Sequence, residues 1–167
     1  PLLNSDKGEK HPVSFIEDAA VEPSLLDKYI AGMENICKKY DISMAFFGHA
    51  GDGELHIRPY LDLNNPDDIK RLRNIAEETF ELAWSLGGTI SGEHADGLVR
   101  SPFIERQYGK EYYQLLCDIK NIFDPDGILN PGKIINSDLD VMLKNFRGIK
   151  LAAGENFQTE LQFADQH

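Results

Sequence analysis

The stretch that decides the fold is Gly48-His49-Ala50-Gly51-Asp52-Gly53-Glu54-Leu55-His56-Ile57-Arg58, which follows a β-prone segment at residues 42–47. Its Asp-Gly dipeptide is a hairpin signal, because both central residues of a type I′ turn need positive φ. With Asp52-Gly53 as a two-residue turn, His49 is predicted to pair directly with His56 across two antiparallel strands. Their Cβ atoms would then lie about 4.5–5.5 Å apart on one face of the sheet.

Alternation along this hairpin separates a polar face from an apolar face. Phe47 and Arg58 form the next predicted pair on the face of the two histidines. The opposite face is expected to be core and consists of Met44, Phe46, Ala50, Leu55 and Ile57. Two imidazoles placed in this way can share a divalent metal at roughly 2.0–2.1 Å per bond. The alternative is a pair of exposed or merely hydrogen-bonded histidines, so the hairpin alone leaves the role of the pair open.

A second glycine-bounded turn, Gly92-Glu93-His94, adds a carboxylate and a third imidazole. Adjacent residues that leave a strand point in different directions. Glu93 is therefore predicted to complete a set of two histidines and one carboxylate, while His94 faces elsewhere, toward a substrate. Three protein ligands and an open position are typical of a catalytic metal site. Alternatively, Glu93 only caps the turn that follows it.

The rest of the chain is predicted to form both helices and strands. Helical periodicity and capping signals predict helices at residues 24–39, 66–86, 102–109 and 111–123. In the last of these, the apolar side chains of Tyr112, Leu115, Leu116, Ile119, Ile122 and Phe123 are expected to point inward. Short strands are expected at residues 13–16 and 89–91. A hairpin combined with helices favours an α+β fold, an antiparallel sheet with helices packed on one face.

Composition excludes several classes of protein. The chain has 167 residues, 41% of them apolar and 27% charged, and this balance suits one globular domain with or without a tail. The net charge of −11 repels phosphate, so we expect no nucleic-acid partner. Cys37 and Cys117 lie in no paired motif, which disfavours a disulfide scaffold or a metal cluster bound by cysteines within this chain. We find no transmembrane segment or signal peptide and expect a cytoplasmic location, free or peripheral to a membrane.

Three blocks of sequence resemble one family. They are residues 48–56, residues 87–94 and residues 123–133, the last reading Phe123-Asp124-Pro125-Asp126-Gly127-Ile128-Leu129-Asn130-Pro131-Gly132-Lys133. They are similar to the C-terminal (cap) domain of the FAD-linked oxidases, flavoenzymes that include D-lactate dehydrogenases, the glycolate oxidase flavin subunit and D-2-hydroxyglutarate dehydrogenase. The resemblance implies that residues 1–136 are the C-terminal part of a ferredoxin-like cap domain. Residues 137–167 would be a linker or docked tail toward a possible downstream iron–sulfur domain.

The resemblance also implies roles for individual residues. His49, His56 and Glu93 match the positions that bind a divalent ion, for which zinc, manganese or iron are candidates. His94 matches the proposed base near the flavin, while Asn130 and Lys133 match a loop near that cofactor. The FAD-binding domain of the family precedes the cap, so this chain is expected to be part of a larger enzyme and inactive alone. Two positions depart from the family pattern, Glu54 in place of Asn and Asp96 within the turn that follows His94.

The reaction implied is oxidation of a 2-hydroxy acid to a 2-oxo acid, with metal-assisted loss of the hydroxyl proton and hydride transfer to FAD. Arg58 is a candidate to bind the substrate carboxylate, although the sequence favours an ion pair with one of the many acidic residues. Electrons would leave through an iron–sulfur protein or a quinone. The alternatives are a metal-dependent hydrolase that uses a His-His-Glu site, and a non-catalytic module that covers the cofactor of a partner.

Overall fold

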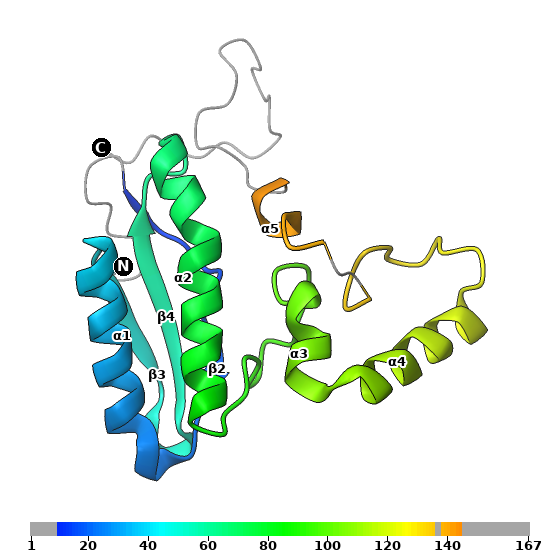
Figure 1. Cartoon of the computed structure of the whole chain (residues 1–167), viewed down its shortest axis with the longest axis horizontal. Coiled ribbons are helices and arrows are strands. Elements are labelled where there is room, and N and C mark those ends of the chain that lie inside the picture. The colour runs from blue at the N-terminus through cyan, green and yellow to red at the C-terminus, as the bar shows by residue number, and fades with distance from the viewer. Residues whose placement is uncertain (1–9, 136–137, 145–167) are drawn as a thin grey trace, which may run out of the picture.

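The computed structural model describes residues 10–135 and 138–144, and Figure 1 shows a four-stranded sheet beside two long helices. Strand β4 (Glu54–Leu61) is the centre of the sheet and pairs with β3 (Met44–His49) along one edge. Two short strands, β1 (His11–Pro12) and β2 (Ala19–Ala20), share its other edge. All of these pairings are antiparallel.

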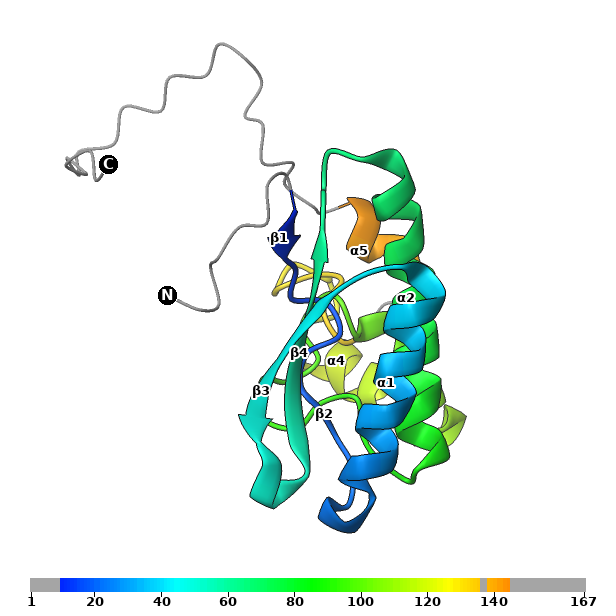
Figure 2. The same cartoon turned by 90° about the vertical axis from the view of Figure 1, so that its left-hand side faces the viewer.

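Helices α1 (Leu26–Tyr40) and α2 (Pro66–Ser85) cover the same face of this sheet, as Figure 2 shows. The side chain of Asn65 caps α2 by accepting a hydrogen bond from the backbone N–H of Asp67 at 2.9 Å. Tyr29 and Met33 of α1 enter one hydrophobic core with Ile57 and Leu61 of β4. The predicted α+β fold, with an antiparallel sheet and helices on one face, is confirmed.

The hairpin between β3 and β4 differs from the predicted two-residue turn. Residues 50–52 form a short 3₁₀ turn, η3 (Ala50–Asp52), and Gly53 closes it with φ of 74°. Asp52 does not adopt the positive φ that a type I′ turn requires at both central positions, so the loop has four residues. His49 therefore pairs with Glu54, and Phe47 pairs with His56. This register differs from the predicted one by two residues and keeps His49, His56 and Arg58 on the same face.

Three local predictions were wrong. Residues 13–16 form no strand; the chain bends between β1 and β2, where Asp18 has φ of 84°. Residues 89–91 contribute a single bridge, between Thr89 and Ala20, because the backbone N–H of Ser91 donates to the Thr89 hydroxyl and does not continue a ladder. On the hairpin, Ala50 lies in the turn and Phe46 is 39% exposed on an edge strand, so neither belongs to the core.

The chain after the second glycine-bounded turn is helical. It forms η4 (Ser101–Phe103), α3 (Ile104–Tyr108) and α4 (Lys110–Phe123). Phe103 and Ile104 are fully buried, but none of the residues of α4 is. The prediction that the apolar stripe of α4 points inward was therefore wrong, because the helix contributes no residue to the hydrophobic core of the described chain.

Of the expected linker or tail at residues 137–167, the structure describes only residues 138–144, and the rest lies outside the described residues. The short helix α5 (Val141–Lys144) buries Val141 and Met142, and Met142 joins the hydrophobic core. Residues 141–144 thus pack on the domain, and the assignment of residues 137–167 as a linker or docked tail stays a prediction. No helix within the described ranges has the length and apolar character needed to cross a bilayer.

The hairpin turn can be tested with two glycines that lie two residues apart. A Cβ at Gly53 would come within 1.8 Å of the Val21 carbonyl oxygen, at a backbone φ of 74° that disfavours any side chain. Gly51 has open space around it. We expect Gly53→Ala to lower the free energy of unfolding by about 2 kcal/mol or more, and Gly51→Ala to change it by less than about 0.5 kcal/mol. Equal losses for the two variants in urea titrations would contradict this account of the turn.

Candidate metal and base cluster

The side chains predicted from two separate turns meet around one carboxylate. Nε2 of His49 lies 3.3 Å from Glu93 Oε1, and Nε2 of His56 lies 3.2 Å from the same oxygen. One ligand atom from each of the three residues falls within 4.8 Å of the others. The two rings meet edge to face with centroids 5.6 Å apart, as expected for diagonal neighbours on one sheet face.

His94 belongs to the same cluster and does not face elsewhere as predicted. Its Nε2 lies 3.4 Å from Glu93 Oε1, and its ring stacks on His56 with centroids 4.7 Å apart and planes 3° from parallel. The expectation of divergent side chains assumed a strand, whereas residues 92–95 form an irregular loop in which Ala95 has φ of 61°. Nδ1 of His94 lies 3.4 Å from Glu17 Oε1.

The cluster has a buried side and an open side. The side chain of His56 is 6% exposed, whereas those of His49, Glu93 and His94 are 54%, 47% and 42% exposed. Nδ1 of His56 is buried and has no hydrogen-bond partner within the described chain. A ligand can therefore reach the cluster from the side of the exposed groups, with His56 as its floor.

Asp18 holds the loop that carries Glu93 and His94. Its carboxylate accepts hydrogen bonds from the backbone N–H groups of Gly92 (3.0 Å), Glu93 (2.9 Å) and His94 (3.0 Å) and from the Ser91 hydroxyl. Asp18 is fully buried, and the Arg100 guanidinium lies 3.6 Å from its Oδ2. Sequence reasoning missed this residue, because no local pattern links position 18 to a turn more than 70 residues later.

Glu54 is a second buried carboxyl group beside Asp18. Burial, together with a hydrogen bond to Asp18 and the charges of Glu93 and Asp18, raises the pKa of Glu54 to about 7. Burial alone would raise the pKa of Asp18 too. Hydrogen bonds from Glu54 and from the loop N–H groups, with the charge of Arg100, nevertheless hold it below its ordinary value. Below a pH of about 7, these shifts favour a proton on Glu54 that is donated to an ionised Asp18.

Asp96, which departs from the family pattern in the turn after His94, also has a shifted pKa. Burial and the charge of Asp18 raise the pKa of the Asp96 carboxyl group, and Arg100 opposes this shift. Its Oδ1 is buried without a hydrogen-bond partner among the described residues. The acids at positions 54 and 96 therefore add protonatable groups behind the cluster rather than exposed negative charge in it.

Arg58 lies on the cluster face but is already paired. Its Nε donates to Glu17 Oε2 at 2.9 Å, and its guanidinium lies over the Phe47 ring at 5.3 Å from the centroid. This is the ion pair that the sequence left as an alternative. Because the other oxygen of Glu17 faces His94, Glu17 connects the arginine to the histidine.

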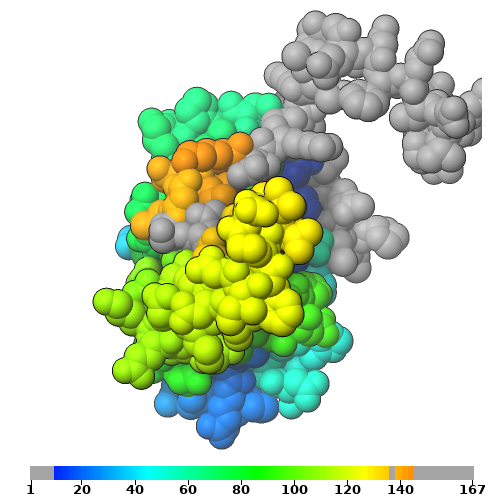
Figure 3. All heavy atoms as spheres, turned by 90° about the vertical axis from the view of Figure 1, so that its right-hand side faces the viewer, coloured from blue at the N-terminus to red at the C-terminus, as the bar shows by residue number. Residues whose placement is uncertain are grey.

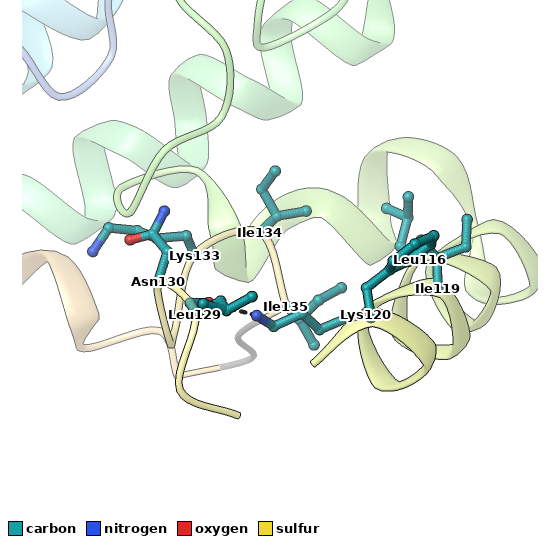
Figure 4. Close-up of a pocket in the computed structure, with 9 residues that line it drawn as sticks. Leu116, Ile119, Lys120, Leu129, Asn130, Lys133, Ile134 and Ile135 are labelled. Atoms are coloured by element: carbon teal, nitrogen blue, oxygen red, sulfur yellow. Dashed lines mark hydrogen bonds between the residues drawn. The ribbon is translucent and has the colours of Figure 1, made fainter. Parts of the chain in front are cut away.

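Asn130 and Lys133 do not join the histidine cluster. They line a separate pocket of about 340 Å³ with side chains from α4, shown in Figure 4. Asn130 has φ of 48°, a left-handed conformation that asparagine tolerates better than most residues. The loop that carries them is fastened to η4, since the N–H of Ile134 donates to the Ser101 hydroxyl at 2.7 Å.

The donor set around Glu93 suits a divalent ion. Ligand atoms bound at about 2.0–2.2 Å to a tetrahedral ion lie about 3.3–3.6 Å from one another. The contacts of His49 and His56 with Glu93, 3.3 and 3.2 Å, are close to that spacing. Two imidazoles and one carboxylate are also ligands that zinc, manganese and iron accept. The residues present could therefore hold such an ion with an open position toward solvent.

Comparison with known proteins agrees with the sequence blocks. A family model described as FAD linked oxidases, C-terminal domain, matches residues 2–134. The chain belongs to this family. The match covers the hairpin, both glycine-bounded turns, α4 and the loop after it.

Individual relatives of the family are longer than this chain. The glycolate oxidase subunit GlcD of Bacillus subtilis is 42% identical over 127 residues, which are 76% of this chain and 27% of the relative. D-2-hydroxyglutarate dehydrogenase of Haemophilus influenzae is 39% identical over 133 residues, 80% of this chain and 13% of the relative. D-lactate dehydrogenase of Archaeoglobus fulgidus is 35% identical over 129 residues, 77% and 28% of the two chains. The chain thus spans between about an eighth and a quarter of these relatives.

The role of Asp18 can be tested by removing its charge. In Asp18→Asn, an amide donor replaces one acceptor oxygen opposite three backbone N–H groups, and Arg100 loses its countercharge. We expect the free energy of unfolding to fall by roughly 2–4 kcal/mol, with faster amide hydrogen exchange at residues 92–94. The control is Asp27→Asn, which changes an exposed acid whose carboxylate accepts a hydrogen bond from the backbone N–H of Lys28. Unchanged exchange at residues 92–94 would contradict the role of Asp18.

Proposed function

We propose that this chain is the C-terminal substrate domain of an FAD-dependent oxidoreductase that oxidises a small 2-hydroxy acid to the 2-oxo acid. Membership of the FAD-linked oxidase family supports the reaction class. The names of three relatives refer to glycolate, D-2-hydroxyglutarate and D-lactate, which are all 2-hydroxy acids. The observation that carries the proposal is the convergence of His49, His56 and His94 on Glu93 Oε1.

In this proposal, three residues of the cluster bind a metal ion and a fourth accepts a proton. His49, His56 and Glu93 would hold a divalent ion, which when bound supplies a Lewis acid that favours ionisation of a substrate hydroxyl group. FAD, bound mainly by a domain outside this chain, supplies the hydride-accepting chemistry. His94 would take the hydroxyl proton at a ring nitrogen. Its stacking on the buried ring of His56 limits its motion, and the Glu17 carboxylate lies beside its Nδ1.

Substrate binding and electron transfer belong to the same proposal. Arg58 would attract the substrate carboxylate while Glu17 holds its Nε, and Asn130 and Lys133 would lie near the cofactor in the assembled enzyme. An iron–sulfur domain or a quinone remains the predicted electron acceptor. A cytoplasmic location, free or peripheral to a membrane, and the domain boundary at residue 136 also remain predictions.

The metal assignment can be tested by equilibrium binding. After chelation and dialysis, the wild-type chain is expected to bind about one equivalent of zinc or manganese. His49→Ala should lower the metal affinity by roughly 100-fold or more, because it removes a direct ligand. Substitution of residues that only hydrogen-bond to the ligands already lowers metal affinity by about 10–100-fold. His11→Ala, which changes a histidine on β1, is the control and should bind like wild type. The same affinity in all three proteins, or no binding by wild type, would sink the assignment.

The base can be tested in the full-length flavoenzyme by stopped-flow measurement of flavin reduction. His94→Ala is expected to slow reduction by the 2-hydroxy acid by roughly 10²–10⁴-fold, with FAD content unchanged. A change of less than about threefold would remove His94 from the mechanism. Ester or amide cleavage stimulated by metal, without any reduction of flavin, would instead favour the hydrolase alternative.

A further inference from the structure

Two buried polar atoms behind the metal cluster face each other without a partner. Buried side-chain nitrogen or oxygen atoms that lack a hydrogen bond occur in five residues of the described chain, Tyr29, Glu54, His56, Thr79 and Asp96. Nδ1 of His56 and Oε1 of Glu54 are two of these atoms, and they lie 4.0 Å apart. This distance is too long for a hydrogen bond, whose nitrogen and oxygen lie about 2.9–3.0 Å apart. A movement of about 1 Å would bring the two atoms into hydrogen-bond range.

The strand that carries both residues places Glu54 behind His56. Glu54 begins β4 two residues before His56, so the two side chains lie on one face of the sheet. Figure 3 shows the hairpin of β3 and β4 in cyan at the lower right edge of the molecule. The side chains are 9% and 6% exposed, respectively. A Cβ at Gly92 would come within 2.7 Å of Glu54 Oε1, so the loop that carries Glu93 lies directly on this carboxyl group.

The ring of His56 presents its two nitrogens to different carboxyl groups. Nε2 lies 3.2 Å from Glu93 Oε1, where the proposed ion would bind, and Nδ1 lies toward Glu54. A neutral imidazole carries one N–H, so a metal bound at Nε2 leaves the proton on Nδ1. A buried N–H without an acceptor is costly, and metal-binding histidines generally donate this second N–H to a carboxylate, a carbonyl or water. Metal binding therefore creates a need for an acceptor beside Nδ1.

Asp18 is another carboxylate close to His56, but its oxygens are already occupied. One of its oxygens lies within 4.8 Å of a nitrogen of His56. However, this carboxylate accepts four hydrogen bonds from residues 91–94 and lies beside the Arg100 guanidinium. Of the two carboxyl groups, only Glu54 has a buried oxygen without a donor among the described residues. Glu54 is therefore the better acceptor for the Nδ1 proton.

We propose that Glu54 is a positioning residue of the metal site, which accepts a hydrogen bond from Nδ1–H of His56 when a divalent ion is bound at Nε2. The inference rests on the proposed function. The hydrogen bond would fix the orientation of the ring and the tautomer that leaves Nε2 free to bind. A carboxyl group that donates its proton to Asp18 keeps acceptor lone pairs, so both contacts of Glu54 are compatible. Position 54 departs from the family pattern, and the resemblance assigns it no role.

Two variants separate the acceptor from the size of the side chain. In Glu54→Gln the amide can accept from His56 and donate to Asp18, whereas Glu54→Met keeps the length and offers no comparable acceptor. The full-length enzyme is freed of metal with a chelator and titrated with zinc. We expect Glu54→Met to lower the zinc affinity by roughly 10–100-fold and Glu54→Gln to stay within about threefold of wild type. Equal zinc affinity in wild type and Glu54→Met would overturn the proposal.

The control is the same change at a glutamate away from the cluster. Glu78 lies on α2, is 35% exposed and pairs with Lys39. We expect Glu78→Met to bind zinc like wild type. An equal loss of zinc affinity in Glu78→Met and Glu54→Met would show a general effect on the fold and overturn the role of Glu54.

The Nδ1 proton of His56 reports the hydrogen bond directly. In zinc-loaded enzyme labelled with ¹⁵N-histidine, NMR should detect this proton in slow exchange with solvent in wild type and Glu54→Gln, and in faster exchange in Glu54→Met. Fast exchange in wild type, or the same exchange in Glu54→Met as in wild type, would overturn the proposal. If Glu54→Met instead speeds only the amide exchange of residues 92–94, Glu54 acts through Asp18 and the proposal is wrong.

The metal assignment and the role of Glu54 can fail separately. If wild type binds no zinc, or His49→Ala binds it as tightly as wild type, the metal assignment fails and the role of Glu54 falls with it. If His49→Ala loses zinc but Glu54→Met binds it like wild type, only the role of Glu54 fails.

Discussion

The candidate site depends on one buried carboxylate. Asp18 reaches across from the β1–β2 segment and accepts three consecutive backbone N–H groups from residues 92–94. Two further backbone contacts join this region to the β1–β2 segment, the bridge between Thr89 and Ala20 and the bond from the Gly92 N–H to the Asp18 carbonyl oxygen. A buried anion of this kind is costly unless it is well hydrogen-bonded and paired. The loop N–H groups, Arg100 and the proton on Glu54 meet that requirement together, so the same contacts stabilise Asp18 and place Glu93 and His94.

The hairpin shows how much of the site could be predicted from sequence. The turn and the register were wrong, yet both histidines were placed correctly on one face. The reason is that side chains alternate with a period of two, so an error of two residues preserves the face. What the alternation could not predict is which residues cover the opposite edge of β4. The contacts of Glu17 and Asp18 with His94 depend on tertiary packing over 76 residues of chain and leave no local pattern.

Hydrophobic periodicity predicted which helix face is buried in α1 and α2 but not in α4. The apolar stripes of α1 and α2 agreed with burial, as did the Asn65 cap of α2, and both helices were confirmed. In α4 the stripe was equally clear, but none of its residues is buried in the described structure. Periodicity indicates that one side of a helix is apolar, but it does not indicate what packs against that side. The family match, which covers only part of its longer relatives, is consistent with that difference.

Glu17 links the two charged groups on the open side of the cluster. One of its oxygens accepts a hydrogen bond from Arg58 and the other faces His94, so a single carboxylate lies between the guanidinium and the imidazole. An anionic substrate drawn toward Arg58 would compete with Glu17 for the guanidinium and thereby change the electrostatic environment of His94. Binding of a carboxylate at Arg58 and the contact of Glu17 with His94 would then be coupled through a single acid. This arrangement gives a physical reason for the arginine, although already paired, to lie on the same sheet face as the histidines.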